Sequence, residues 1–286
     1  MKRTVAAHLS LEALAPARLV LSIAVAGGPT ASRESVGAAG AAGAADAAGA
    51  AADRVELLSV MQGGAEVPVR EVTDEHGTRL HLAEVAAGPV EVDYHADLAG
   101  PAHPSPGADI DLVRYLRPSR YCESDSLGPT AHAEFAGLEG ADLLHGVTSW
   151  VGQKLSYVPG ARLPTDGAVR TLLARRGVCR DYAHLVVALL RARDVPARLV
   201  SVYAPGLAPM DFRAVAEAFV DDAWQVVDAT LLAPRQSLVR IATGRDAADT
   251  AFLTTIGGGV LLHSMAVSAV VDELPRDDLT ELVRLR

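Results

Sequence analysis

The most informative stretch of the sequence is Gly177-Val178-Cys179-Arg180-Asp181-Tyr182-Ala183-His184-Leu185, which opens a predicted helix over residues 179–193. A cysteine at the N-terminus of a helix lies beside free backbone N–H groups and the positive end of the helix dipole, and both favour an anion. We therefore expect the pKa of the Cys179 thiol to fall and its thiolate to be the reactive form. Because most cysteines at helix starts are small buried residues, a packing role stays open at this point.

The segments around this helix change from helices to strands along the chain. Helices are predicted over residues 109–116, 139–155 and 168–176, and strands over residues 197–203, 214–220, 223–229, 238–243 and 260–271. Helices followed by antiparallel strands predict an α+β domain. We assign residues 108–273 to this domain and residues 274–286 to a C-terminal tail, in which residues 277–286 are expected to form a short helix.

The first 100 residues are expected to form a separate, all-β domain. Short apolar segments between turn signals predict strands over residues 4–14, 18–26, 54–60, 67–72, 78–85 and 89–96. A low-complexity insertion at about residues 31–53 consists largely of alanine and glycine, and we interpret it as disordered, with a polyalanine helix as the alternative. Residues 101–107 contain three prolines and are predicted to be a linker.

Composition excludes several classes of protein. The 286 residues include 26 Lys and Arg against 35 Asp and Glu, a formal charge of -9, whereas a nucleic-acid-binding surface usually needs a basic face. The two cysteines, Cys122 and Cys179, form no disulfide framework, and Cys122 is expected to be a small buried residue. CxxC and HxxxH spacings are both missing, so no metal or cofactor is indicated.

The N-terminus resembles a signal peptide only in part, because charged residues and a proline interrupt it and two strands explain it better. No run approaches the ~20 apolar residues of a membrane span, so no membrane association is expected. We expect a cytoplasmic protein, whose oligomeric state the sequence leaves open.

Further motifs precede and follow the Cys179 helix in a fixed order. They are Pro118-Ser119-Arg120-Tyr121-Cys122, Tyr157-Val158-Pro159-Gly160, Asp211-Phe212-Arg213-Ala214 and Ala223-Trp224-Gln225-Val226-Val227-Asp228. This order resembles the bacterial transglutaminase-like family, relatives of the papain-fold cysteine enzymes, over about residues 109–257. The resemblance implies a papain-like transglutaminase core, with helices packed on an antiparallel sheet, and the N-terminal β region is similar to the domain that precedes it in many of these proteins.

The resemblance also implies roles for individual residues. Cys179 takes the position of the nucleophile and Asp228 that of the acid that orients the catalytic histidine. The histidine position itself, two residues after Asp211, is occupied by Arg213, which follows Cys179 by 34 residues and precedes Asp228 by 15. This is the main departure from the family pattern.

Three further residues are candidates for substrate binding. Tyr121 and Tyr157 are expected to line the cleft or donate to an oxyanion, with core packing as the alternative. Asp181 is the third candidate, although a carboxylate so near a helix start more often caps the helix. His184 lies one and a half turns beyond Cys179 and is expected to pack rather than act as a base.

The arginine at the histidine position decides the expected function. A thiol enzyme of this type uses its histidine to take the thiol proton and then to protonate the departing amine. Arginine stays charged and supplies only electrostatic help. We therefore expect a thiol hydrolase or acyltransferase that acts on peptide or amide bonds and is impaired, or restricted to good leaving groups such as thioesters. The alternative is a non-catalytic descendant that binds a peptide or protein partner in the same cleft.

Overall fold

The computed structural model describes residues 1–27, 54–74, 76–99, 108–160 and 163–285. The predicted insertion and the predicted linker lie outside the described residues. The chain divides into unit 1, which consists of Met1–Pro101 and Phe252–Glu273, and unit 2, which consists of Ala102–Ala251 and Leu274–Arg286.

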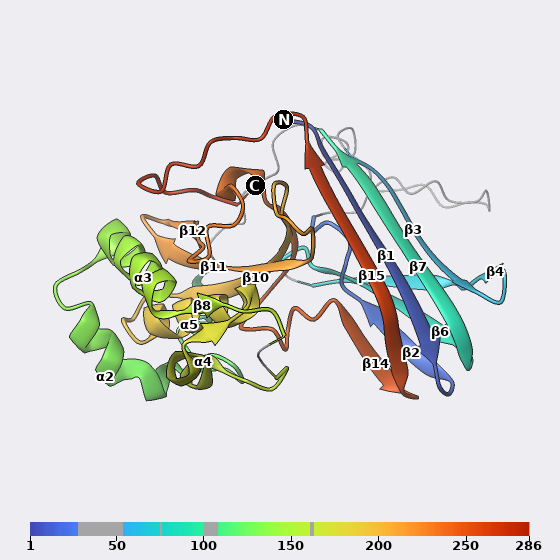
Figure 1. Cartoon of the computed structure of the whole chain (residues 1–286), viewed down its shortest axis with the longest axis horizontal. Helices are drawn as coiled ribbons and strands as arrows, with labels where there is room; N and C mark the ends of the chain where they lie inside the picture. Colours follow the sequence, from blue (N-terminus) through green and yellow to red (C-terminus); the bar gives the residue numbers. More distant parts are fainter. Residues whose placement is uncertain (28–53, 75, 100–107, 161–162, 286) are drawn as a thin grey trace. The chain divides into compact units, whose positions relative to one another are not determined.

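Unit 1 contains two antiparallel sheets (Figure 1). In order across the first sheet, the strands are β15 (Val260–Val271), β1 (Arg3–Ala13), β7 (Gly88–Leu98), β3 (Arg54–Gln62) and β4 (Ala65–Glu66). Across the second they are β14 (Leu253–Gly257), β2 (Ala17–Leu21), β6 (Arg79–Val85) and β5 (Val69–Thr73). Buried and half-buried side chains alternate strictly along β1, the pattern of a strand with one face on a core. The all-β prediction for the N-terminal region is thus confirmed.

The boundary between the two units differs from the expected one. β15 pairs with β1 along its whole length, from Arg3↔Val271 to Ala13↔Val260, and β14 pairs with β2. Residues 252–273 therefore complete the sheets of unit 1 and are not part of the α+β domain to which we had assigned them. Their partners lie more than 230 residues away in the sequence, so local patterns carry no sign of this pairing.

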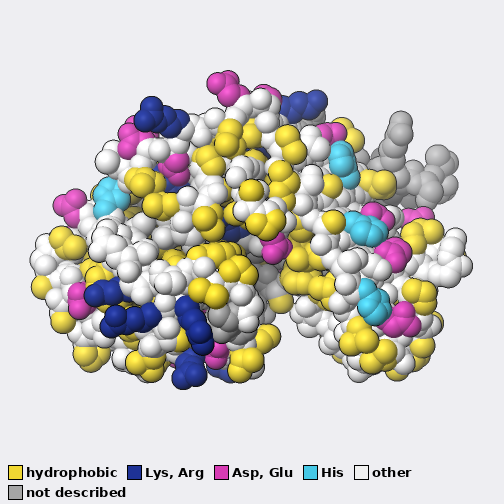
Figure 2. Space-filling model, viewed as in Figure 1, with side chains coloured by type: hydrophobic (Ala, Val, Ile, Leu, Met, Phe, Trp, Pro, Cys, Tyr) yellow, Lys and Arg dark blue, Asp and Glu magenta, His cyan; other side chains and the backbone are white. Residues whose placement is uncertain are grey.

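The surface of unit 1 carries histidines intermixed with acidic side chains (Figure 2). His8 on β1 lies 2.8 Å from a carboxylate oxygen of Asp93 and 3.3 Å from one of Glu91, both on β7. These pairs are solvent-exposed, where such contacts contribute ~0–1 kcal/mol to stability.

Unit 2 has the expected α+β architecture. Its sheet has the order β12 (Ala223–Val227), β11 (Arg213–Val220), β10 (Ala197–Tyr203) and β13 (Val239–Gly244), all antiparallel. Its α-helices are α1 (Asp109–Arg114), α2 (Ser124–Glu134), α3 (Gly140–Lys154), α4 (Ala168–Ala174) and α5 (Cys179–Arg191). The two-residue strands β8 (Ser156–Tyr157) and β9 (Arg176–Gly177) pair in parallel, and η1 (Arg235–Ser237) is a 3-10 turn.

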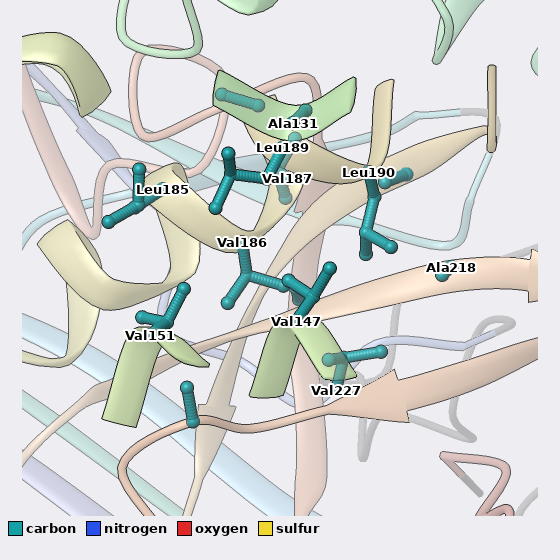
Figure 3. Close-up of a cluster of buried hydrophobic side chains, with 14 of the residues drawn as sticks. Ala131, Val147, Val151, Leu185, Val186, Val187, Leu189, Leu190, Ala218 and Val227 are labelled. Atoms are coloured by element: carbon teal, nitrogen blue, oxygen red, sulfur yellow. The ribbon is translucent and has the colours of Figure 1, made fainter. Parts of the chain in front are cut away.

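Helix α5 is the centre of the unit 2 core. Every residue from Asp181 to Arg191 is buried, and side chains of α2, α3, β11 and β12 surround its apolar residues (Figure 3). Fully burying one Leu or Val side chain stabilises a fold by ~1.5–3 kcal/mol. This packing fixes the N-terminal end of α5, where Cys179 lies.

Two segments of unit 2 differ from the prediction. Helix α2 was not predicted, because Gly128 and Pro129 in its middle conceal the helical pattern. The predicted helix over residues 277–286 is absent from the described residues 277–285. This segment instead packs as irregular chain: the Val226 N–H donates to the Val283 carbonyl at 2.7 Å, and Leu285 is buried. None of the helices in the described ranges is both long and apolar enough to cross a membrane.

Candidate active site

The carboxylate of Asp181 caps the N-terminal end of α5. Its Oδ2 accepts the Val178 N–H at 2.9 Å, and its Oδ1 accepts Arg180 Nη2 at 3.0 Å. A Cβ on Gly177 would lie 2.6 Å from the Asp181 Cβ, so glycine is what lets the cap approach. Asp181 is fully buried and both its oxygens are engaged, which leaves no exposed oxygen for a substrate. The capping interpretation of Asp181 fits this geometry, and substrate binding by Asp181 stays a prediction.

Cys179 is the first residue of α5 and is half-buried. The backbone N–H groups of Arg180 and of Ala214 on β11 donate to its sulfur, and the positive charge of Arg213 also acts on it. Burial outweighs these effects and raises the pKa of the Cys179 thiol. The expected fall of this pKa was wrong, because the helix end and the arginine do not compensate for the loss of water around the sulfur.

Arg213 and Asp228 form a buried ion pair. Arg213 begins β11, Asp228 directly follows β12, and Nη2 of the arginine lies 2.6 Å from Oδ2 of the aspartate. The two residues are 2 % and 4 % exposed. Thr230, which was not predicted, completes the group: its N–H and hydroxyl donate to Asp228 Oδ1 at 3.0 and 2.8 Å, and its Oγ1 accepts from Arg213 Nη2.

The remaining nitrogens of Arg213 are less well satisfied. Nε and Nη1 are buried and have no hydrogen-bond partner among the described residues. A guanidinium is a donor only and keeps its proton at any ordinary pH. The group at the histidine position therefore holds a fixed positive charge and cannot pass a proton to or from Cys179.

Tyr157 at the end of β8 also lies at this site. Its side chain is 41 % exposed, and its hydroxyl is within hydrogen-bonding reach of the Cys179 backbone. Burial, followed by the nearby Cys179, raises the pKa of the Tyr157 phenol, and the charges of Arg213 and Asp211 act on it as well. The structure thus brings together Cys179, Arg213, Asp228 and Tyr157, while substrate binding by Tyr157 stays a prediction.

Comparison with known proteins agrees with this geometry. Residues 138–229 match the family model described as the transglutaminase-like superfamily, a range that includes Cys179, Arg213 and Asp228. This part of the chain belongs to the transglutaminase-like superfamily.

One solved structure is similar to the whole chain. It is the crystal structure of a candidate cysteine protease from Cytophaga hutchinsonii, with 26% sequence identity and a TM-score of 0.80, and the match covers 99% of this chain and 96% of that one. The uncharacterized protein ML0607 of Mycobacterium leprae (strain TN) is 41% identical over 54 residues, which is 19% of this chain. The match spans 19% of that relative, about a fifth of its length.

Tyr121 and His184 pack against each other within the transglutaminase-like domain. Their rings stack with centroids 5.3 Å apart, and His184 Nε2 accepts the Ala247 N–H at 3.1 Å. Burial strongly lowers the pKa of His184, so the ring is neutral. The packing role expected for His184 is confirmed. Tyr121 is held by this stacking and by its N–H, which donates to Asp246 at 2.9 Å; its role in substrate binding stays a prediction.

A cavity of about 570 Å³ in the transglutaminase-like domain is lined in part by Thr230. It is lined by α3, the chain after Asp228 and the C-terminal segment, through His145, Thr148, Ser149, Gly152, Gln153, Ala229, Thr230, Leu231, Leu279 and Thr280. Nε2 of His145 is buried without a partner in the described part of the chain. The lining is amphipathic, and Thr230 links it to the Arg213–Asp228 pair.

Proposed function

We propose that this chain is a transglutaminase-like thiol protein of the cysteine protease and acyltransferase type, with turnover of peptide and amide bonds that is strongly reduced. The observation that carries the proposal is the 2.6 Å pair between Arg213 and Asp228. This pair supports the proposal because arginine cannot exchange a proton near neutral pH, and acyl transfer from an amide needs a group that can.

The chemistry of amide cleavage explains why the reduction is large. The amine leaves well only when an acid protonates it, and general acid–base help typically contributes ~100- to 10,000-fold to the rate. The raised pKa of the Cys179 thiol adds to the loss, because little thiolate exists near neutral pH. What remains is a nucleophile, a fixed positive charge and a set of N–H donors.

Arg213→His tests this proposal. An imidazole at this position lies within reach of Asp228 and supplies the missing proton carrier, so we expect amidase or transamidase activity to rise by ~100-fold or more on a mixture of fluorogenic amides. Cys179→Ala in the same background should abolish the gain. A folded Arg213→His protein with no gain on any amide would contradict the proposal that the missing histidine is what limits turnover.

A second candidate function is the binding of a peptide or protein partner without catalysis. The cavity beside Thr230 favours it, because its lining combines the hydroxyls of Thr148 and Ser149 with the exposed side chains of Leu231 and Leu279, which suits an extended peptide. Ser149→Trp would fill part of this cavity from α3. Peptide-array binding that survives Cys179→Ala but is lost in Ser149→Trp would support this function, and binding that survives both would contradict it.

A further inference from the structure

Two of the three nitrogens of Arg213 are available for a ligand. Nη2 is engaged by Asp228 and Thr230, whereas Nε and Nη1 have no partner among the described residues although the side chain is only 2 % exposed. Leaving a buried donor unsatisfied costs ~1–3 kcal/mol, and more when it is charged. Arg198 Nη1 is buried without a partner in the described part of the chain as well, so it is the position of the Arg213 donors near Cys179 that points to an acceptor bound there during function.

The surroundings of Arg213 place these donors beside the nucleophile. Its charge acts on the Cys179 thiol and on the Tyr157 phenol. The next residue in the chain, Ala214, donates its N–H to the Cys179 sulfur. An acyl group attached to that sulfur, or a group departing from it, therefore lies within the field of the guanidinium.

We propose that Nε and Nη1 of Arg213 stabilise an anionic leaving group, and that the substrates of Cys179 are acyl thioesters. This inference rests on the proposed function and names its substrate class. A thiolate needs no proton in order to depart, so a fixed positive charge serves it where an imidazolium would serve an amine. An amine without protonation would leave as a far more basic anion, and one guanidinium does not offset that difference.

The reaction balances without a proton carrier at position 213. Hydroxide or a buffer base removes the thiol proton of Cys179, and the thiolate attacks the carbonyl carbon of the thioester. A new carbon–sulfur bond forms to Cys179, and the carbon–sulfur bond to the leaving group breaks. The electron pair of that bond stays on the leaving sulfur, which departs as a thiolate beside Nε and Nη1. Water, an amine or another thiol then attacks the acyl-Cys179 carbonyl and gives up its proton to the solvent. The carbon–sulfur bond to Cys179 breaks, and its electron pair stays on the Cys179 thiolate.

Charge at the site favours a thiolate over an acyl phosphate. Asp228 already neutralises much of the Arg213 charge, and Asp211 lies close enough to act on Tyr157. A phosphate leaving group would bring about two negative charges beside these carboxylates. A thiolate brings one charge on a polarisable sulfur, and that charge develops only as the bond breaks.

The test uses the full chain and aryl thioesters of one acyl group with leaving thiols of graded acidity. Acyl-Cys179 is followed by intact mass and located by peptide mass, so that Cys122 is counted separately, and Cys179→Ala is the blank. We expect the wild-type acylation rate to depend weakly on the acidity of the leaving thiol. In the charge-neutral variant Arg213→Gln/Asp228→Asn, we expect it to depend steeply and to be about 100-fold lower for the least acidic thiol.

Arg213→Lys keeps the test decisive if the double variant does not fold. Lysine preserves the pair with Asp228 but lacks the two further N–H groups. We expect roughly tenfold slower acylation with the least acidic leaving thiol and little change with the most acidic. A dependence on the leaving thiol that is the same in wild type and in every folded variant would overturn the inference and leave the proposed function standing. Absence of acyl-Cys179 with any thioester in the wild type would overturn the proposed function itself.

Discussion

Strand β11 carries two buried ion pairs that differ in what lies beside their arginines. At Glu217, both carboxylate oxygens are bound by arginines: Arg198 Nε lies 2.8 Å from Oε2, and Arg240 Nη2 lies 2.7 Å from Oε1. The Arg198 guanidinium is covered by the ring of Trp224 at 3.9 Å. At Arg213, four residues earlier, one carboxylate and one hydroxyl bind a single nitrogen, and the other two have no partner among the described residues. Arg198 Nη1 is also buried without a partner in the described part of the chain, so leftover donors occur in both pairs. What distinguishes the Arg213–Asp228 pair, here called the open pair, from the structural pair at Glu217 is that its charge acts on a nucleophile, Cys179.

Removal of the Glu217 charge should have the largest effect on stability. Glu217→Gln leaves the buried Arg198 and the partly buried Arg240 without their counterion, and we expect the free energy of unfolding to fall by ~3–5 kcal/mol in urea denaturation. The matched control is Asp249→Asn, which breaks the exposed pair with Arg245 and should cost less than ~1 kcal/mol. Equal losses of unfolding free energy in the two variants would contradict the view that the Glu217 ion pairs stabilise the fold.

The ion pairs of Glu217 should also make the stability of the protein depend on pH in the acidic range. The buried arginines lower the pKa of Glu217 from 4.5 to about 2, against the opposing effect of its burial. A lowered folded-state pKa stabilises the fold above the unfolded-state value and loses that contribution as the pH falls towards about 2. We expect the urea midpoint to drop between pH 4.5 and pH 2, and the drop to be smaller in any Glu217→Gln protein that folds. A midpoint that is flat over this range would count against the pairing.

The sequence predicted most of unit 2 and the identity of its central residues. Periodicity located α3 and α5, and the motif order located Cys179, Arg213 and Asp228. The direction of the Cys179 pKa was missed because it depends on how the whole core around α5 excludes water, whereas the sequence shows only the helix end. Thr230 was missed because its hydroxyl becomes significant only when the chain after β12 folds back onto Asp228.

Long-range pairing accounts for the other differences. Glu217 lies on β11, an interior strand, and its two arginine partners come from β10 and β13. In unit 1, β15 follows the whole α+β domain in sequence and still pairs with β1. Strand pairing between segments so distant in sequence leaves no local pattern. It therefore cannot be predicted from a single sequence.

The environment that the open pair gives Cys179 should be detected first in the pH dependence of Cys179 alkylation. Burial raises the thiol pKa, so we expect the rate with iodoacetamide to keep rising with pH beyond 8.5, about tenfold per pH unit, without a plateau near neutrality. Cys122, which is fully buried and whose pKa burial also raises, should stay unmodified and serves as the internal control. A plateau below about pH 7 would mean that Arg213 and the helix end outweigh burial after all.

The smallest expected effect is the most specific to the open pair. The negative charge of Asp228 raises the pKa of the Cys179 thiol, while the positive charge of Arg213 lowers it. Asp228→Asn keeps one acceptor oxygen, where the carboxylate has one for Thr230 and another for Arg213. It removes the opposing charge, so the guanidinium should act on the sulfur more strongly. We expect the pKa of the Cys179 thiol to fall and alkylation at pH 7.5 to become roughly threefold faster. Slower alkylation in a folded Asp228→Asn protein would show that Asp228 holds Arg213 in place rather than opposing its charge. Arg213 would then depend on its aspartate as the arginines on β10 and β13 depend on Glu217, and the contrast between the two pairs would be lost.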